Sequence, residues 1–116
     1  MITPVTYNIH VYKSRDFDVT FTLTDSNDDP IDLSSSTIEA QIRKSKDTNS
    51  DLITDLTVTE TDLVNGEFKL SLTDTETADF EIGEGFYDVC ITDASGISYT
   101  YIEGSVSFHE SVTVKA

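Results

Sequence analysis

The chain has 116 residues, and its 22 acidic and 7 basic side chains give a formal net charge of −15. This charge argues against nucleic acids and anionic membranes as partners, because phosphate contacts need clustered lysine and arginine. No apolar run approaches the roughly 20 residues of a membrane-spanning helix, and the N-terminus carries no apolar signal core. We therefore expect one domain over residues 1–116, made in the cytoplasm, with no disulfide bond because Cys90 is the only cysteine.

Alternation of apolar and polar side chains with a two-residue period predicts strands along most of the chain. The most regular stretch runs from Arg15 to Lys44, where Phe17, Val19 and Phe21 face one way and polar residues the other. The predicted strands, in chain order, are 6–12, 17–24, 37–44, 52–59, 67–72, 85–92 and 97–108.

Several local signals predict turns and irregularities between and within these strands. Asn65-Gly66 predicts a turn between apolar runs. Thr73 with Glu76 three residues later forms a capping-box pattern, which predicts one helical turn after the fifth strand. In the last strand the alternation changes phase at Tyr101-Ile102, which predicts a β-bulge or a change of partner there.

Seven strands with a turn every 8–12 residues indicate an all-β fold, an immunoglobulin-like β-sandwich of about seven antiparallel strands. The short helical turn between the fifth and sixth strands agrees with this pattern. Tyr87 has two interpretations: its hydroxyl bonds back to the corner between these strands, or it is an ordinary core aromatic.

The loop that starts at Asp25 resembles a calcium-binding loop only at its beginning, D-x-N-x-D. Pro30 stands where such a loop needs glycine, and Ser36 where it needs glutamate, so we expect an acidic turn without metal. The two histidines, His10 and His109, lie near opposite ends of the chain. No spacing typical of a catalytic or cofactor site occurs, and we expect a protein that is not an enzyme and needs no cofactor.

Charge placement suggests a partner-binding surface. If the strands run up and down, the turns after the first and third strands lie at the same end and carry most of the basic side chains: Lys13, Arg15, Arg43, Lys44 and Lys46. Exposed aromatic contacts could come from Tyr99 and Tyr101, which are out of phase with the core residues of their strand. The alternative is that both tyrosines pack under a loop.

Several segments resemble a known family. They are P-I-D-L before the third strand, A-Q-I-R-K within it, L-S-L-T-D-T-E-T, Y-D-V followed by T-D-A-S-G, and E-G-S-V. Across roughly residues 7–114 the chain resembles small immunoglobulin-like virion proteins of tailed bacteriophages. These include the N-terminal domain of phage baseplate upper proteins and short stand-alone relatives.

The resemblance implies a structural virion protein that joins or decorates capsid, neck, tail or baseplate. Because the sequence stops at Ala116 without a trimerising extension, we expect an adaptor or decoration unit. Its partners would be other virion proteins in a symmetric, multi-copy assembly, reached through the first and last strands as sheet edges. Two alternatives are a carbohydrate- or host-surface-binding module and a secreted domain stabilised by divalent metal, the latter disfavoured by the missing signal peptide.

Overall fold

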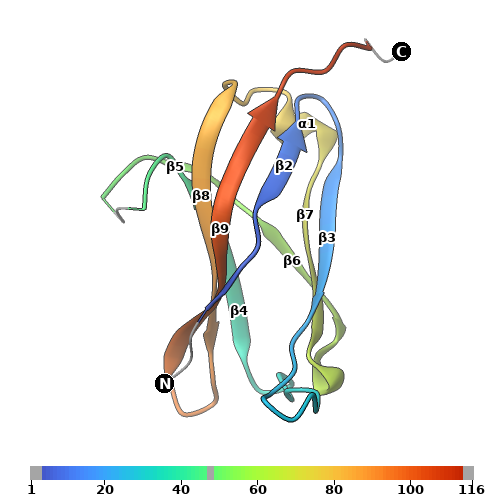
Figure 1. The fold of residues 1–116 in the computed structure, drawn as a ribbon, viewed down its shortest axis with the longest axis vertical. Coiled ribbons are helices and arrows are strands. Elements are labelled where there is room, and N and C mark those ends of the chain that lie inside the picture. Colours follow the sequence, from blue (N-terminus) through green and yellow to red (C-terminus); the bar gives the residue numbers. More distant parts are fainter. Residues whose placement is uncertain (1–3, 47–48, 114–116) are drawn as a thin grey trace.

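The computed structural model describes residues 4–46 and 49–113, which form two facing β-sheets (Figure 1). One sheet has the order β1-β9-β8-β4-β5, with β2 also paired to β9, and the other has the order β3-β7-β6. The predicted β-sandwich is therefore confirmed. Its strands are β1 (Val5–Thr6), β2 (Ile9–Tyr12), β3 (Phe17–Thr22), β4 (Thr37–Arg43), β5 (Leu52–Asp55), β6 (Thr57–Asp62), β7 (Glu67–Leu72), β8 (Gly83–Thr92) and β9 (Ser98–His109).

The core lies between the two sheets and is built from one face of each strand. Phe68, Leu70 and Leu72 alternate with half-buried polar residues along β7, the central strand of the smaller sheet. Together these faces remove a continuous apolar layer from water, which is the main stabilising contribution to a fold of this size. The buried apolar residues are Ile9, Val11, Leu33, Ala40, Ile42, Leu56, Phe68, Leu70, Leu72, Phe80, Tyr87, Val89, Ile91, Ile102, Val106 and Phe108.

The predicted strand 52–59 is divided at Leu56. β5 stays beside β4 in the larger sheet, whereas β6 pairs with β7 in the smaller one. Leu56 is buried between the sheets, and its N–H donates to the Ala40 carbonyl at 2.9 Å. Alternation over residues 52–59 places Leu52 on the same face as Leu56, and this prediction is wrong, since Leu52 is 44% exposed. The cause is a shift in the pairing of β5 with β4: Thr54 pairs with Ile42 but Leu52 pairs with Arg43, so Ile53 is one extra residue in β5.

The N-terminal strand is also divided, and both parts run parallel to β9. The break falls at Tyr7, whose carbonyl oxygen lies so close to Gly104 that a Cβ atom there would overlap it. Across the break, the Asn8 side chain accepts a hydrogen bond from the Ser105 N–H at 3.0 Å. Because β1 and β2 cover one side of β9 and β8 the other, the prediction that the last strand is a sheet edge is wrong.

The predicted irregularity in the last strand is confirmed. Val89 pairs with Ile102, but the next residue, Cys90, pairs with Thr100, so Tyr101 is one extra residue in β9. This bulge is the physical cause of the phase change in the sequence, because one inserted residue moves every later side chain to the opposite face.

The predicted capping box forms at the start of α1 (Asp74–Thr77). The Glu76 N–H donates to Thr73 Oγ1 at 3.2 Å, and the Thr73 N–H donates to Glu76 Oε1 at 2.9 Å. The Asp74 N–H donates to the Asp16 carboxylate at 2.8 Å, which joins the helical turn to the β2–β3 turn. The Asn65-Gly66 turn also forms, as a 3-10 turn over Leu63–Asn65 with Gly66 in the left-handed conformation at φ 75°.

Tyr87 follows neither of its two interpretations completely. Its ring is buried in the core, as an ordinary core aromatic would be. Its hydroxyl donates to the Tyr7 carbonyl at 2.5 Å, at the break between β1 and β2 and not at the corner before β8. Burial raises the pKa of the Tyr87 hydroxyl, and so does the neighbouring Tyr7. The hydroxyl therefore ties the N-terminal strands to the core.

Candidate functional site

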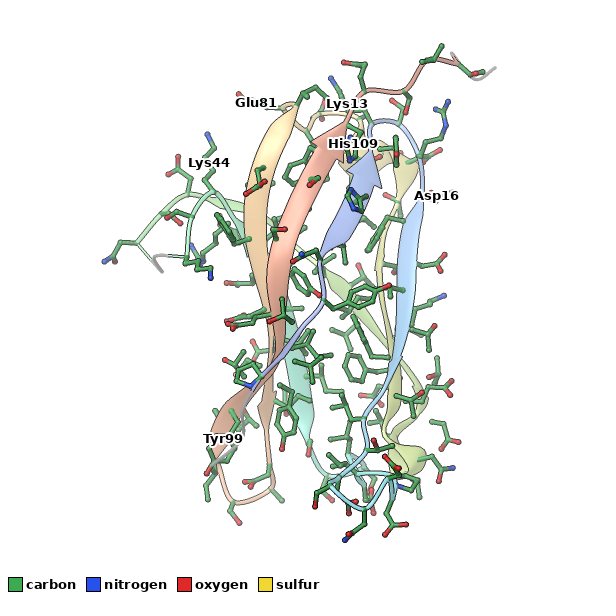
Figure 2. All side chains as sticks on the ribbon, viewed as in Figure 1. Lys13, Asp16, Lys44, Glu81, Tyr99 and His109 are labelled. Carbon is green, nitrogen blue, oxygen red and sulfur yellow. The ribbon has the colours of Figure 1, made fainter. Side chains whose placement is uncertain are left out.

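Two of the predicted basic residues, Lys13 and Arg15, lie on the turn between β2 and β3. Figure 2 labels Lys13 near the top of the molecule. Both are half-buried. The Arg15 guanidinium donates to the backbone carbonyls of Ser14 at 3.3 Å and Thr113 at 2.6 Å. Much of its hydrogen-bonding capacity therefore holds the chain's own backbone in place.

The other three basic residues, Arg43, Lys44 and Lys46, lie at the end of β4 and in the loop that follows, which projects sideways from the sandwich (Figure 1). Arg43 donates to the Ser50 carbonyl at 2.9 Å and to the Gln41 side chain at 3.0 Å. Lys46 Nζ lies 5.6 Å from the centre of the Phe86 ring, a cation–π distance. The five basic residues thus occupy two separate segments, and their role in binding a partner stays a prediction.

The two predicted contact tyrosines differ in exposure. Tyr99 is 41% exposed, at the end of the sandwich opposite Lys13 (Figure 2). Tyr101 is half-buried and packs against the core, so it offers little free surface. Burial raises the pKa of the Tyr101 hydroxyl, with smaller contributions from Asp93 and Tyr99. The structure therefore separates Tyr99 from Lys13 and Lys44, and leaves Tyr101 with little surface for a partner.

The fold brings together two residues that the sequence places far apart. His10 Nδ1 lies 2.9 Å from His109 Nε2, and the rings stack with centres 5.2 Å apart. The Tyr12 ring also stacks with His109, with ring centres 4.8 Å apart. All three side chains project outward from the parallel β2–β9 pair. Alternation indicates the face that each residue occupies but not which strands pair in parallel, so this cluster could not be predicted from the sequence.

The acidic loop after β3 forms a tight turn. The Asp25 carboxylate accepts hydrogen bonds from the N–H groups of Asn27 at 2.8 Å and Asp29 at 3.1 Å, and Asp28 adopts a positive φ of 62°. Both bonds end on Oδ1 of Asp25, so the carboxylate stabilises its own loop, as in an Asx turn. Within residues 4–46 and 49–113, no three His, Cys, Asp or Glu side chains are placed to hold a metal ion.

A groove with a volume of about 580 Å³ separates β5 from the segment between α1 and β8. Phe80 and Phe108 line it and pack edge to face, with ring centres 4.9 Å apart. Along its sides lie the exposed side chains Leu52 and Ile82. Its charged residues are four carboxylates and one ammonium group: Glu76, Asp79, Glu81, Glu84 and Lys44. We call it the β5–β8 groove.

A smaller hollow of about 200 Å³ lies on the outer face of the larger sheet, with Arg43 and Lys46 on one side and Asp88 and Glu103 on the other. Asp88 and Glu103 are directly opposite each other on β8 and β9. Burial raises the pKa of the Asp88 carboxyl, the Glu103 charge raises it further, and Arg43 opposes both. The balance of charge in this hollow gives it no clear preference for a partner.

Comparison with known proteins supports the fold. No protein-family model matches the chain, nor does any curated protein. Among solved structures, the SrpA adhesin of Streptococcus sanguinis (R347E mutant) is similar at 17% identity and a TM-score of 0.54, over 88% of this chain and 54% of that one. The GspB Siglec domain is similar at 20% identity and a TM-score of 0.51, over 90% and 54%. The chain thus spans about half the length of these structures.

At these identities the likeness concerns the fold alone, and it agrees with the sandwich described above. None of the helices in the described part of the chain has the length and apolar character needed to cross a membrane.

Proposed function

We propose that the protein is a non-catalytic binding module that attaches to other protein subunits, and that it serves as a small adaptor or decoration unit of a tailed-phage virion. The virion role rests on the sequence resemblance. The attachment role rests on the sheet edges, because β3 and β6 are both end strands of the three-stranded sheet.

The β3 edge is the observation that carries the attachment role. The N-terminal strands pair with β9 instead of β3, which leaves the six residues Phe17–Thr22 paired on one side only. An unpaired edge offers backbone N–H and C=O groups to an incoming strand. Asp18, Thr20 and Thr22 are exposed along it, so a partner strand can approach without displacing core residues.

A protein inventory by mass spectrometry of purified particles, with heads and tails separated, tests the virion role. We expect the chain in one fraction, in a fixed ratio to a major structural protein. If particles lack the chain, the virion role is wrong.

Edge substitutions test the attachment role. Thr20→Lys places a charge on β3 that disfavours strand addition, and Thr59→Lys makes the matched change on β6. Pull-down of partner subunits should weaken with Thr20→Lys and persist with Thr59→Lys. Equal capture by both variants and the original chain would exclude the β3 edge.

Binding to a carbohydrate or host surface is the second candidate. It is favoured by the adhesin and the Siglec domain among the structures of similar fold. A glycan array probed with the isolated domain separates the two candidates: saturable binding to a defined glycan supports this one, whereas the adaptor role predicts none.

A further inference from the structure

We propose that the β5–β8 groove binds a cationic, partly apolar peptide segment of a partner protein. The inference names the chemistry of a partner and rests on the proposal that the domain binds other proteins. It does not depend on which assembly contains that partner.

The floor of the groove is apolar and closely packed. Gly85 is buried next to two lining residues, Ile53 and Phe108: a Cβ added to it would sit 3.3 Å from both Ile53 Cδ1 and Phe108 Cε2 and 2.9 Å from the Arg43 carbonyl oxygen. The missing side chain lets Ile53 of β5 approach Phe108 closely. The volume of about 580 Å³ falls within the range of ligand sites in proteins. The floor is therefore shaped by close packing and does not depend on a flexible side chain.

Two large apolar side chains beside the floor have much of their surface in water. Ile82 is 52% exposed and Leu52 is 44% exposed. They stand on different segments, Leu52 on β5 and Ile82 just before β8, and both line the same groove. Covering them would remove apolar surface from water at roughly 25 cal/mol per Å². An apolar side chain of a partner, inserted between them, would gain this contribution.

The charges around the groove favour a partner segment of positive charge. Glu76, Asp79, Glu81 and Glu84 are all exposed, and Lys44 is the one basic residue among the lining side chains of the described chain. Figure 2 shows Lys44 and Glu81 on the same upper side of the molecule. Lysine or arginine next to an apolar residue matches this arrangement, because electrostatic complementarity increases the association rate and excludes partners of the wrong sign.

The same charges argue against other occupants. In a symmetric pair of copies the acidic rims would face each other, and each copy already carries a net charge of −15. Nucleic acids and anionic lipid surfaces would meet four carboxylates. A cationic peptide segment is thus the occupant that the observations favour.

The test titrates the ¹⁵N-labelled protein with the peptide acetyl-Lys-Ile-Arg-Phe-Lys-amide and follows its backbone NMR signals. The charge-reversed peptide acetyl-Glu-Ile-Glu-Phe-Glu-amide serves as the ligand control. We expect saturable shifts at Ile53, Gly83 and Phe108 with the cationic peptide, and none with the acidic one. Affinity should fall several-fold when NaCl rises from about 50 to about 300 mM.

Ile82→Ser removes one apolar wall, and Ile97→Ser is its matched control because Ile97 is 50% exposed in the distant β8–β9 turn. Ile82→Ser should weaken binding of the cationic peptide at least about fivefold, and Ile97→Ser should leave it unchanged. The spectrum of each variant without peptide shows whether it folds. The double variant Glu81→Gln/Glu84→Gln tests the contribution of the acidic side chains separately from that of the apolar wall.

Equal binding of both peptides, or equal effects of the two serine substitutions, would overturn the proposal. So would a dimer in sedimentation velocity that Ile82→Ser dissociates, because a second copy would then fill the groove. If the peptide binds as expected but purified particles lack the chain, the virion role fails and the groove assignment stands. If particles contain the chain but the peptide does not bind, the groove assignment alone fails.

Discussion

At the scale of single residues, Thr77 joins two turns that are distant in sequence. It is completely buried, and its Oγ1 accepts a hydrogen bond from the Arg15 N–H at 3.1 Å and donates to the Arg15 carbonyl at 2.8 Å. Thr77→Val keeps the shape of the side chain but leaves both backbone groups without this partner. We expect the free energy of unfolding, measured with urea, to fall by about 1–3 kcal/mol.

The control for this substitution is Thr77→Ser, which retains the hydroxyl and loses one methyl group. Its loss of stability should be smaller than that of Thr77→Val. If serine costs as much as valine, then packing of the methyl group, and not the pair of hydrogen bonds, is what Thr77 contributes.

Asp88 and Glu103 form a like-charge pair across β8 and β9. Because folding raises the pKa of Asp88, through burial first and Glu103 second, the folded state holds this proton more tightly than the unfolded state. Stability therefore falls as the pH rises through the interval between the ordinary pKa of aspartate and the higher value in the fold. Glu103→Gln should raise the free energy of unfolding at pH 7 by roughly a few tenths of a kcal/mol.

Urea unfolding at several pH values tests this pair. The advantage of Glu103→Gln should disappear in acid, where both carboxyls are protonated in the original chain. Glu39→Gln makes the same charge change on β4, opposite Cys90 instead of a carboxylate. An equal gain from Glu39→Gln would show that only the net charge of the chain matters, not this pair.

At the scale of elements, the N-terminal strands depend on Gly104. A Cβ at this position would overlap the Tyr7 carbonyl, which is also the acceptor of the Tyr87 hydroxyl. Gly104→Ala should displace the chain between β1 and β2 and lower stability by about 1–3 kcal/mol. Hydrogen exchange should show lost protection at the Tyr7 N–H, which donates to the Glu103 carbonyl at 2.9 Å.

The neighbouring change Ser105→Ala leaves the Ser105 N–H free to donate to Asn8 and should cost little. Unchanged protection of Tyr7 in Gly104→Ala would mean that the strands can shift sideways without losing their pairing.

These elements also show what the sequence could and could not predict. The bulge at Tyr101 was predictable because an inserted residue leaves a visible break in alternation, and the capping box at Thr73 because it depends on residues three apart. Parallel pairing of β2 with β9 was not predictable, since alternation specifies a face but no partner strand. The His10–His109 contact was missed for the same reason.

The β5–β8 groove was missed because an irregularity in β5 hides its walls. Ile53 is an extra residue in the pairing of β5 with β4, which turns Leu52 away from the face of Leu56, and no local signal in the sequence marks this irregularity. The acidic residues before β8 were visible in the sequence, but their position opposite β5 depends on long-range packing. A charge pattern alone could therefore not reveal the apolar floor beside it.

At the scale of the whole molecule, the net charge of −15 is distributed over a body of 44 × 32 × 21 Å. At about 10 mM salt the Debye length is roughly 30 Å, longer than the shortest dimension, so carboxylates on opposite faces repel each other. At about 150 mM it is roughly 8 Å, and only near neighbours still interact. Self-repulsion of this kind opposes the compact state more than the expanded one.

We therefore expect the melting temperature to rise by several degrees when NaCl is increased from about 10 to about 150 mM. KCl should have the same effect, because screening depends on ionic strength and not on the identity of the cation. Circular dichroism or scanning calorimetry measures the change.

CaCl₂ at equal ionic strength separates screening from binding. A larger rise in melting temperature with calcium than with NaCl, lost in Asp25→Asn, would show that the acidic loop binds the ion despite its internal hydrogen bonds. A melting temperature that does not change with salt would mean that the acidic side chains are too far apart, or too well hydrated, to oppose folding.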